Sequence, residues 1–306
     1  LDRERMLCVM PLFHVYASHV CLHTMVYARG TLVILPRYRP QDVLDTLTRE
    51  RITIFAGSPT IFSGLLNYDG FPNADLSALG FSYSGSSALP AEVLRHWEEA
   101  TGSPVVEGYG QSEAGPVASY NPLHGERKPG SVGPALPETE IEIVDLDRGT
   151  TVLPTGEQGE IRVRGPQIMR GYRKRPEETA TALRGGWLYT GDIGAFDEDG
   201  YLYIRDRKKE MIIVSGYNVF PREVEDILYT HPAIREAAVV GMADDYRGEI
   251  VRAVVALVPG AKADAEDLLA HCRANLAKYK VPTVIDIVDE VAKTPVGKID
   301  KKALRG

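Results

Sequence analysis

The sequence has few cysteines and no long apolar run, and both absences narrow the class of protein. Its three cysteines, Cys8, Cys21 and Cys272, form no CxxC pair, which argues against a disulfide framework and against a zinc site. No apolar stretch approaches the roughly 20 residues that a membrane-spanning helix needs, so no transmembrane segment is predicted. A basic and then apolar leader is also missing, and the expected location is cytoplasmic.

An excess of positive charge is missing as well. The 35 Lys and Arg residues face 42 Asp and Glu residues, and the net charge of −7 argues against a nucleic-acid partner. The 306 residues are enough for more than one domain. The sequence starts at Leu1 without an initiator Met and soon enters an apolar strand, so we expect a piece of a longer protein.

Strands and helices alternate along the first 130 residues. Apolar runs predict strands at 6–10, 31–35, 52–56 and 105–106, and helical spacing predicts helices at 14–27, 40–50, from 58 onward and 91–100. This alternation predicts a parallel sheet covered by helices. Segments rich in Gly and Ser, within 81–90 and 107–113, follow two of the strands, where such folds bind ligands. A pair of tight turns is the alternative interpretation.

The pattern changes after about residue 131. Alternating runs at 141–144 and 161–164, separated by Gly-containing turns, predict a small antiparallel barrel-like sheet. Beyond a charged run at 206–210, strands at 211–214, 236–241 and 250–258 and helices at 221–229 and 264–277 predict a compact α+β unit. The fold class is therefore α/β plus α+β. The predicted boundaries are 1–130 for a partial α/β subdomain, 131–205 for the barrel-like subdomain, 206–210 for a hinge and 211–306 for a mobile C-terminal domain.

Several motifs in order carry a resemblance to a known family. GYGQSE starts at Gly108, GWLYTGDIG at Gly186, DGYLYIRDRKKEMIIVSGYNVFP at Asp199 and KTPVGK at Lys293. Together they resemble the adenylate-forming superfamily, which includes acyl-CoA synthetases, peptide-synthetase adenylation domains and firefly luciferase. The run from Asp206 to Pro221, with YKVP at 279–282, looks most like fatty-acyl-CoA synthetases. The family's Ser/Thr/Gly-rich phosphate loop, which ends in Pro-Lys-Gly and precedes the PLFH segment, is absent, so the chain looks like the C-terminal portion of a synthetase.

The resemblance implies a nucleotide site for ATP and AMP. Its residues would be Gly85, Ser86, Ser87, Glu107, Gly108, Tyr109, Gly110, Gln111, Ser112, Asp192 and Arg207. Tyr109 would offer its ring to adenine, Ser112 would bond the α-phosphate, and Asp192 and Arg207 would hold the ribose. Glu113 would be the Mg²⁺ ligand. The alternatives are a core tyrosine for Tyr109, a surface carboxylate for Glu113, a turn-forming aspartate for Asp192 and a solvated charge for Arg207.

The resemblance also implies residues for catalysis and for domain rotation. Lys298 would be the catalytic lysine, although Lys293, Lys301 or Lys302 would be equally plausible on charge alone. His14 would line the acyl pocket, with a structural role as the alternative. Lys209 would be the hinge residue, and Gly216 would face the pantetheine tunnel of coenzyme A.

The function implied is that of an acyl-CoA synthetase, an ATP-dependent acid–thiol ligase. It would convert a fatty or other hydrophobic carboxylic acid to acyl-AMP with release of pyrophosphate, and then to a thioester with coenzyme A. Two alternatives stay open: an adenylation enzyme that loads a carrier protein, and an inactive nucleotide- or CoA-binding fragment. The oligomeric state, a homodimer included, and the length of the acyl chain stay open too.

Overall fold

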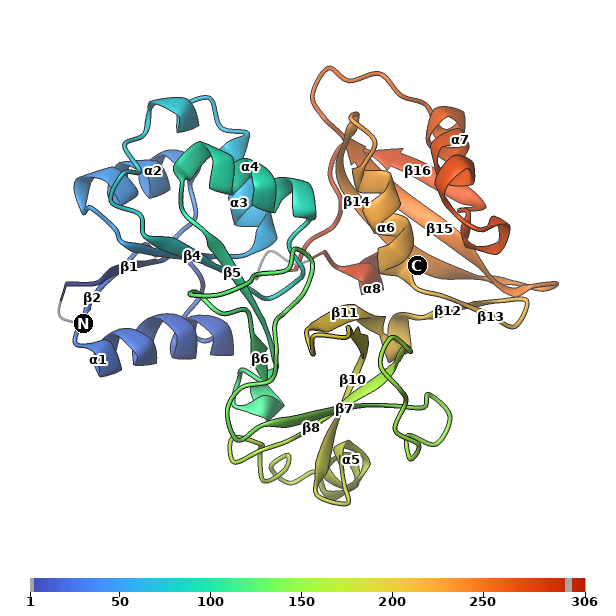
Figure 1. Cartoon of the computed structure of the whole chain (residues 1–306). Coiled ribbons are helices and arrows are strands. Elements are labelled where there is room, and N and C mark those ends of the chain that lie inside the picture. Colours follow the sequence, from blue (N-terminus) through green and yellow to red (C-terminus); the bar gives the residue numbers. More distant parts are fainter. Residues whose placement is uncertain (1–2, 295–298, 306) are drawn as a thin grey trace. The chain divides into compact units, whose positions relative to one another are not determined.

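The computed structural model describes residues 3–294 and 299–305 and forms two compact units (Figure 1). The first comprises Leu1–Thr190 and Gly194–Ile204, and the second comprises Gly191–Ile193 and Arg205–Gly306. The predicted fold class is confirmed, since both a parallel sheet with helical cover and an antiparallel sheet are present. The predicted domain boundaries stay predictions.

The parallel sheet of the first unit has the order β2-β1-β3-β4-β5-β6. Its strands are β1 (Arg5–Cys8), β2 (Thr31–Ile34), β3 (Ile54–Gly57), β4 (Phe81–Ser84), β5 (Val105–Tyr109) and β6 (Ser119–Tyr120). The first five run parallel, and β6 pairs antiparallel with β5. Helices α2 (Pro40–Arg49), α3 (Pro59–Leu66) and α4 (Ala91–Thr101) cover one face of this sheet, and α1 (Thr24–Ala28) lies on the other (Figure 1).

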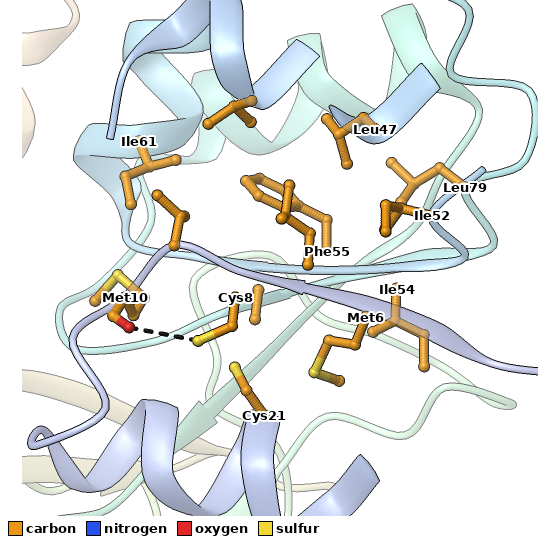
Figure 2. Packing of buried hydrophobic residues seen from close by; sticks show 14 of the residues in the cluster. Met6, Cys8, Met10, Cys21, Leu47, Ile52, Ile54, Phe55, Ile61 and Leu79 are labelled. Carbon is orange, nitrogen blue, oxygen red and sulfur yellow. Dashed lines mark hydrogen bonds between the residues drawn. The ribbon is translucent and has the colours of Figure 1, made fainter. Parts of the chain in front are cut away.

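The core of this sheet is built on both of its faces. Phe55, Phe62 and Trp97 are fully buried and their rings contact one another on the side of α3 and α4. On the opposite side, the thiol of Cys21 points toward the sheet, and the thiol of Cys8 donates a 3.4 Å hydrogen bond to the carbonyl of Met10 (Figure 2). Cys21 belongs to a π-helix, Ala17–His23, that precedes α1 where a regular helix was predicted over 14–27. Apolar runs predicted β1, β2, β3 and β5 to within three residues, whereas β4 and β6 were not predicted as strands.

The second sheet has the order β11-β10-β8-β7, with β9 paired to β10. Its elements are β7 (Glu140–Val144), β8 (Gly159–Arg164), β9 (Leu183–Arg184), β10 (Trp187–Phe196) and β11 (Leu202–Arg207), and α5 (Pro176–Ala182) precedes β9. The pairs β7–β8 and β9–β10 are antiparallel, as the alternating pattern predicted. The short helix α5 was not predicted, because none of its residues is buried and it has no apolar stripe to signal it.

The second unit contains a five-stranded sheet with the order β13-β12-β15-β14 and β16 beside β15. Its elements are β12 (Ile212–Val214), β13 (Tyr217–Val219), β14 (Ile234–Asp244), β15 (Gly248–Leu257), β16 (Val284–Val288), α6 (Pro221–Tyr229), α7 (Ala265–Asn275) and α8 (Lys301–Leu304). Ala237 and Val239 pack in the core with α6 and α7, whereas the intervening Ala238 packs with Leu304 of α8. Since strand side chains alternate, α8 covers the opposite face of the sheet from α6 and α7.

Candidate functional site

Two of the predicted nucleotide-binding segments follow adjacent parallel strands. Ser82, Tyr83 and Ser84 of β4 pair with Val105, Val106 and Glu107 of β5. The segment 85–87 leaves the carboxyl end of β4, and the segment 110–113 leaves the carboxyl end of β5. Carboxyl ends of parallel strands lie at one edge of the sheet, so the fold brings these two segments together where α/β proteins bind ligands.

One detail of this prediction was wrong. Glu107, Gly108 and Tyr109 were expected in the loop, but they are the last three residues of β5. Gly108 pairs with Tyr120 and Tyr109 pairs with Ser119 of β6, so a strand that follows later in the chain extends β5. Short local sequence cannot reveal this pairing, because it depends on backbone groups ten residues away.

The turn after β4 is tightly built and leaves polar groups unused. A side chain at Gly85 would come within 2.9 Å of the ring of Tyr16, whose hydroxyl donates a 3.1 Å hydrogen bond to the carbonyl of Tyr83. Ser86 has a positive φ of 74°. Within the described part of the chain, the buried hydroxyls of Ser84 and Ser86 have no hydrogen-bond partner. Buried polar groups are normally paired, so these hydroxyls fit a site that a polar ligand completes.

Glu107 supports this turn from the neighbouring strand. Its side chain is buried, and its Oε1 accepts a 3.1 Å hydrogen bond from the backbone N–H of Leu89. The arrangement holds the residues after Ser87 against β5. Glu107 therefore has a positioning role that the sequence alone did not indicate.

Close contacts leave no room for a side chain at the glycines on either side of Tyr109. A Cβ at Gly108 would lie 2.2 Å from the ring of Tyr120, and one at Gly110 would lie 1.8 Å from the carbonyl oxygen of Pro116. Tyr109 itself is half-buried against the apolar cluster of the antiparallel sheet. This position agrees with the alternative that Tyr109 is a core tyrosine, and its contact with adenine stays a prediction.

Ser112 and Glu113 form a single turn of 3-10 helix, Ser112–Ala114, after Gln111. Oε1 of Glu113 accepts a 2.8 Å hydrogen bond from the hydroxyl of Tyr172, and its backbone carbonyl accepts one from Met169. Burial, followed by this bond, raises the pKa of Tyr172 to about 12, so the hydroxyl remains a donor at neutral pH. The segment around Tyr172 carried no motif, and its contribution was missed.

The surroundings of Glu113 suit Mg²⁺ better than a metal ion that is coordinated only by protein side chains. Among residues 3–294 and 299–305, no group of three His, Cys, Asp or Glu side chains is gathered in a way that could hold a metal ion. Mg²⁺ usually keeps several waters and takes one or two carboxylates together with phosphate oxygens. A single oriented carboxylate beside a predicted phosphate site agrees with that chemistry.

Asp192 and Arg207 form an ion pair in the second unit. Asp192 lies within β10 and is buried, and its Oδ1 is 3.2 Å from Nε of Arg207, the last residue of β11. The turn alternative for Asp192 is therefore wrong. The side chain of Arg207 is 51% exposed, which leaves donors open to a ligand. The two residues that the resemblance assigns to the ribose are thus in contact.

The charged run 206–210 has more structure than the expected linker. β11 continues through Arg207, and Lys208–Glu210 form a turn of 3-10 helix before β12. Asp206 is buried and accepts hydrogen bonds from the backbone N–H groups of Arg207 and Arg222, at 2.7 and 2.9 Å. Lys209 is exposed, which agrees with its place as a pivot without testing it.

Gly216 lies at the tip of the hairpin that joins β12 and β13. Val214 pairs with Tyr217, and the two residues between them, Ser215 and Gly216, have φ values of 49° and 84°. Positive φ at both central residues is the signature of a type I′ turn. A Cβ at Gly216 would meet no atom within 4 Å, so this glycine is needed for the turn and not for internal packing.

His14 lies in a bend just before the first helical segment. Its Nδ1 accepts a 3.2 Å hydrogen bond from the backbone N–H of Tyr16. This contact matches the structural alternative, and lining of an acyl pocket stays a prediction.

A surface pocket bordered by Phe71, Leu76 and Thr101 contains none of the predicted site residues.

The predicted catalytic lysine, Lys298, lies outside the described residues. Two of its alternatives are engaged elsewhere: Nζ of Lys293 is 2.7 Å from Glu236, and Nζ of Lys301 is 2.8 Å from Glu225. Lys302 is exposed. Charge pairing therefore weakens the case for Lys293 and Lys301 as catalytic groups.

In the described parts of both units, no helix has the length and apolar character needed to span a bilayer.

Comparisons with known proteins agree with the motifs. Residues 1–173 match the family model described as AMP-binding enzyme, and residues 223–298 match the AMP-binding enzyme C-terminal domain. The long-chain-fatty-acid–CoA ligase of Bacillus subtilis is 46% identical over 301 residues, which cover 98% of this chain and 54% of that protein. Feruloyl-CoA synthase of an Amycolatopsis species is 39% identical over 99% of this chain and 61% of its own length.

Solved structures give the same result. ATP-bound MatB from Rhodopseudomonas palustris has a TM-score of 0.94 and 34% identity, over 99% of this chain and 60% of that chain. The anthranilate CoA ligase AuaEII in complex with anthranoyl-AMP has a TM-score of 0.91 and 32% identity, over 99% of this chain and 59% of that chain. The chain spans about half the length of the curated relatives it matches first. Family models match residues 1–173 and 223–298, and relatives match nearly the whole length, so the chain belongs to the family of AMP-binding enzymes.

Proposed function

We propose that the chain provides the nucleotide-binding and thiol-transfer parts of an acyl-CoA ligase. The ligase activates a fatty or other hydrophobic carboxylic acid with ATP and then transfers the acyl group to coenzyme A. Relatives named long-chain-fatty-acid–CoA ligase at 38–46% identity support this class of reaction. The observation that carries the proposal is the side-by-side position of the segments 85–87 and 110–113 at the carboxyl edge of β4 and β5.

In the first step a carboxylate oxygen of the acid forms a bond to the α-phosphorus of ATP, and the bond to pyrophosphate breaks. Two anions must approach each other, so stabilisation of negative charge dominates this step. Ser112 donates to the α-phosphate, and Lys298 supplies a positive charge. Glu113, oriented by Tyr172, would hold Mg²⁺, which neutralises phosphate oxygens when it is bound.

The nucleoside is held by residues from different parts of the chain. In this proposal, Tyr109 and the segment 85–87 of the first unit bind the adenine, and the ion pair of Asp192 with Arg207 in the second unit binds the ribose. A fixed carboxylate accepts from ribose hydroxyls and a guanidinium donates to the same sugar, so this pair suits a diol.

In the second step the sulfur of coenzyme A forms a bond to the acyl carbon, AMP leaves with the bonding electrons, and the thiol proton passes to solvent. Rotation of the C-terminal domain about Lys209 moves Lys298 away from the reacting groups. The same rotation brings the hairpin turn at Gly216 to the pantetheine of coenzyme A. The absence of a side chain at Gly216 leaves room for pantetheine to pass.

The proposal is tested in a polypeptide that carries this chain and spans the full length of its relatives. ATP–pyrophosphate exchange and thioester formation are measured together with saturated fatty acids of increasing length and with ferulate, an acid suggested by the feruloyl-CoA synthase relative. Acid-dependent exchange and an acyl-CoA product are expected. Exchange without a CoA product, but with acylation of a phosphopantetheinylated carrier protein, would favour the carrier-loading alternative.

The chain alone is expected to bind nucleotide and to adenylate weakly, because its sequence lacks the Ser/Thr/Gly-rich phosphate loop. Turnover equal to that of the longer polypeptide would contradict this expectation.

A cytoplasmic location is part of the proposal, and the three buried free thiols of the described residues suit a reducing compartment.

A further inference from the structure

The hairpin that carries Gly216 is joined to the rest of its sheet by very little backbone pairing. Its first strand, β12, lies between β13 and β15, but the register of β12 with β15 contains a single residue pair, Val214 with Gly248. β14, by contrast, pairs with β15 along nearly the whole of both strands. A strand with so short a ladder needs other partners for its backbone N–H groups.

Two hydrogen bonds on either side of Val214 complete the attachment of β12. The N–H of Ile213 donates to Oε2 of Glu249 at 2.8 Å, so a side chain of β15 takes the place of a backbone acceptor. The N–H of Ser215, the first central residue of the hairpin turn, donates to the carbonyl of Arg247 at 2.8 Å. The N–H groups just before and just after Val214 are therefore both held by the start of β15 and the turn that precedes it.

The neighbouring strand leaves a place for the carboxylate of Glu249. A Cβ at Gly241 of β14 would overlap with Oε1 of Glu249, so a glycine at this position makes room for the acid. The side chain of Glu249 is half-buried and continues the row of β15 that includes Val251 and Ala253, both of which belong to the apolar core. Its stem is thus packed along the sheet while its carboxylate bonds the backbone of β12.

The turn between β14 and β15 is fixed independently of Glu249. Oδ1 of Asp244 accepts hydrogen bonds from the N–H groups of Tyr246 and Arg247, at 3.0 and 2.7 Å. This carboxylate holds the turn that supplies the second acceptor for the hairpin. Loss of the Glu249 carboxylate is therefore expected to free the backbone at Ile213 without unfolding the turn beside it.

We propose that Glu249 is a positioning residue for thioester formation, and that it acts through the backbone of Ile213 on the hairpin turn at Gly216. The inference rests on the proposed function, because that function brings this turn to the pantetheine of coenzyme A. A hydrogen bond from a backbone N–H to a carboxylate is stronger than one to a neutral oxygen. Without it, the turn is fixed less firmly where the thiol passes, so the second half-reaction slows and the first does not.

The test uses the polypeptide that carries this chain and spans the full length of its relatives. Palmitoyl-AMP is supplied, and kcat/KM is measured separately for coenzyme A and for pantetheine, which lacks the nucleotide. Glu249→Met removes the acceptor and keeps a long unbranched side chain. We expect kcat/KM to fall by about tenfold for both thiols, as loss of a hydrogen bond to a charged group predicts. ATP–pyrophosphate exchange should be retained.

Two further variants separate the hydrogen bond from other effects of Glu249. Glu249→Gln loses the negative charge, but its amide oxygen can still accept from Ile213. It is expected to keep kcat/KM for both thiols within about twofold of the unaltered value. Gly241→Ala leaves Glu249 in place and displaces its carboxylate with the added Cβ, so it should slow transfer to both thiols as Glu249→Met does.

Asp264 provides a matched control in the same unit. It is an exposed carboxylate whose Oδ1 accepts a 2.9 Å hydrogen bond from the backbone N–H of Asp267 at the start of α7. Asp264→Ala therefore removes a bond of the same kind from a different element. It should lower the stability of the unit and leave transfer to both thiols unchanged.

Each outcome decides the inference or its premise. Unchanged transfer in folded Glu249→Met and Gly241→Ala, an equal loss of pyrophosphate exchange, or the same slowing in Asp264→Ala overturns the positioning role. Slow transfer in Glu249→Gln assigns the effect to charge, and slowing with coenzyme A alone assigns it to the nucleotide of the thiol; either result overturns the inference.

Failure to fold is also decisive. If Glu249→Met does not fold, Gly241→Ala carries the test, and failure of both to fold assigns Glu249 to stability and overturns the positioning role. Absence of thioester formation by the unaltered polypeptide overturns the proposed function instead.

Discussion

The hydroxyl of Tyr172 donates a 2.8 Å hydrogen bond to Oε1 of Glu113, across 59 positions of the sequence. The bond holds the predicted Mg²⁺ ligand in one orientation. A group that orients a metal ligand typically contributes a factor of ten or more to metal affinity. This contact makes Tyr172 a testable part of the site although no motif contains it.

Tyr172→Phe is expected to raise the Mg²⁺ concentration for half-maximal ATP–pyrophosphate exchange by about tenfold, because it removes the donor and very little volume. Saturating Mg²⁺ should restore the rate. Tyr201→Phe is the control, since the hydroxyl of Tyr201 donates to the carbonyl of Glu126 instead. A fall of the same size at every Mg²⁺ concentration would contradict the orienting role.

The pH dependence of this bond follows from the tyrosine. Its folded-state pKa of about 12 lies above the ordinary value of 10.0, so the bond contributes fully below pH 10 and is lost as the pH rises toward 12. The advantage of the unaltered protein over Tyr172→Phe at limiting Mg²⁺ should therefore be constant from pH 7 to pH 9. A steady decline over that range would show that another group controls the effect.

Gly110→Ala should disrupt the first unit. The added Cβ would lie 1.8 Å from the oxygen and 2.7 Å from the carbon of the Pro116 carbonyl, and backbone atoms cannot rotate away as a side chain can. We expect a loss of about 3 kcal/mol or more. Urea unfolding followed by tryptophan fluorescence measures it, because Trp97 and Trp187, the only tryptophans, both belong to the first unit.

Gly80→Ala is the matched control for that substitution. The nearest atom to a Cβ at Gly80 is the carbonyl oxygen of Thr53 at 3.4 Å, an ordinary contact. A change below about 1 kcal/mol is expected. Equal losses for the two glycines would mean that the close approach at Gly110 does not determine stability.

Gly216→Asn tests the role of the hairpin turn in thioester formation. Asparagine adopts positive φ more readily than most residues, so the turn is kept while a side chain is added. Exchange of pyrophosphate should be retained, and transfer to coenzyme A should slow by about tenfold or more as the channel narrows. Undiminished transfer to coenzyme A would contradict a role for this turn in the thiol channel.

Gly216→Ala separates backbone strain from obstruction of the channel. Alanine is smaller than asparagine but costs about 1–2 kcal/mol at positive φ. If strain is the cause of slow transfer, Gly216→Ala will be the more severe variant. If obstruction is the cause, Gly216→Asn will be.

Lys209→Pro should impair one half-reaction more than the other. Proline fixes φ near −65° and restricts the preceding residue, and so opposes the backbone change that rotation at Lys209 requires. Lys209→Ala removes the exposed side chain while leaving the backbone free, and both half-reactions should continue. Acyl-AMP formation from ATP and thioester formation from supplied acyl-AMP are measured separately. Equal loss of both in Lys209→Pro would refute the pivot.

Much of the fold was predictable from local patterns. α6 begins and ends where the apolar spacing placed it, at Pro221 and Tyr229. α7 follows Asp264, whose side chain forms a reciprocal capping box with Asp267. Helices with a proline or a capping residue at their start and an apolar stripe on one face carry their own signals in a few neighbouring residues.

Elements whose signals are not local were missed or misjudged. β13 has only three residues, two of them exposed, and β16 is recognisable only because it pairs with β15, more than 30 positions earlier in the sequence. The segment Ala17–His23 has helical periodicity and packs against β1. It forms a π-helix and not the predicted regular helix. Single-sequence spacing does not distinguish these two helix types, since both place apolar residues three to five positions apart.

The sequence by itself determined the family, the order of the motifs and the residue types that suit a nucleotide, because these depend on chemical identity along the chain. Only the tertiary structure decided which of those residues meet. It extended β5 through Tyr109 by pairing with β6, placed Asp192 inside a strand beside Arg207, and gave Glu113 a partner in Tyr172. It also turned the charged run 206–210 into an anchored segment, because the buried carboxylate of Asp206 accepts a hydrogen bond from the N–H of Arg222 in α6. Hydrogen bonds and ion pairs act over a few ångströms in space, and separation in sequence does not encode that distance.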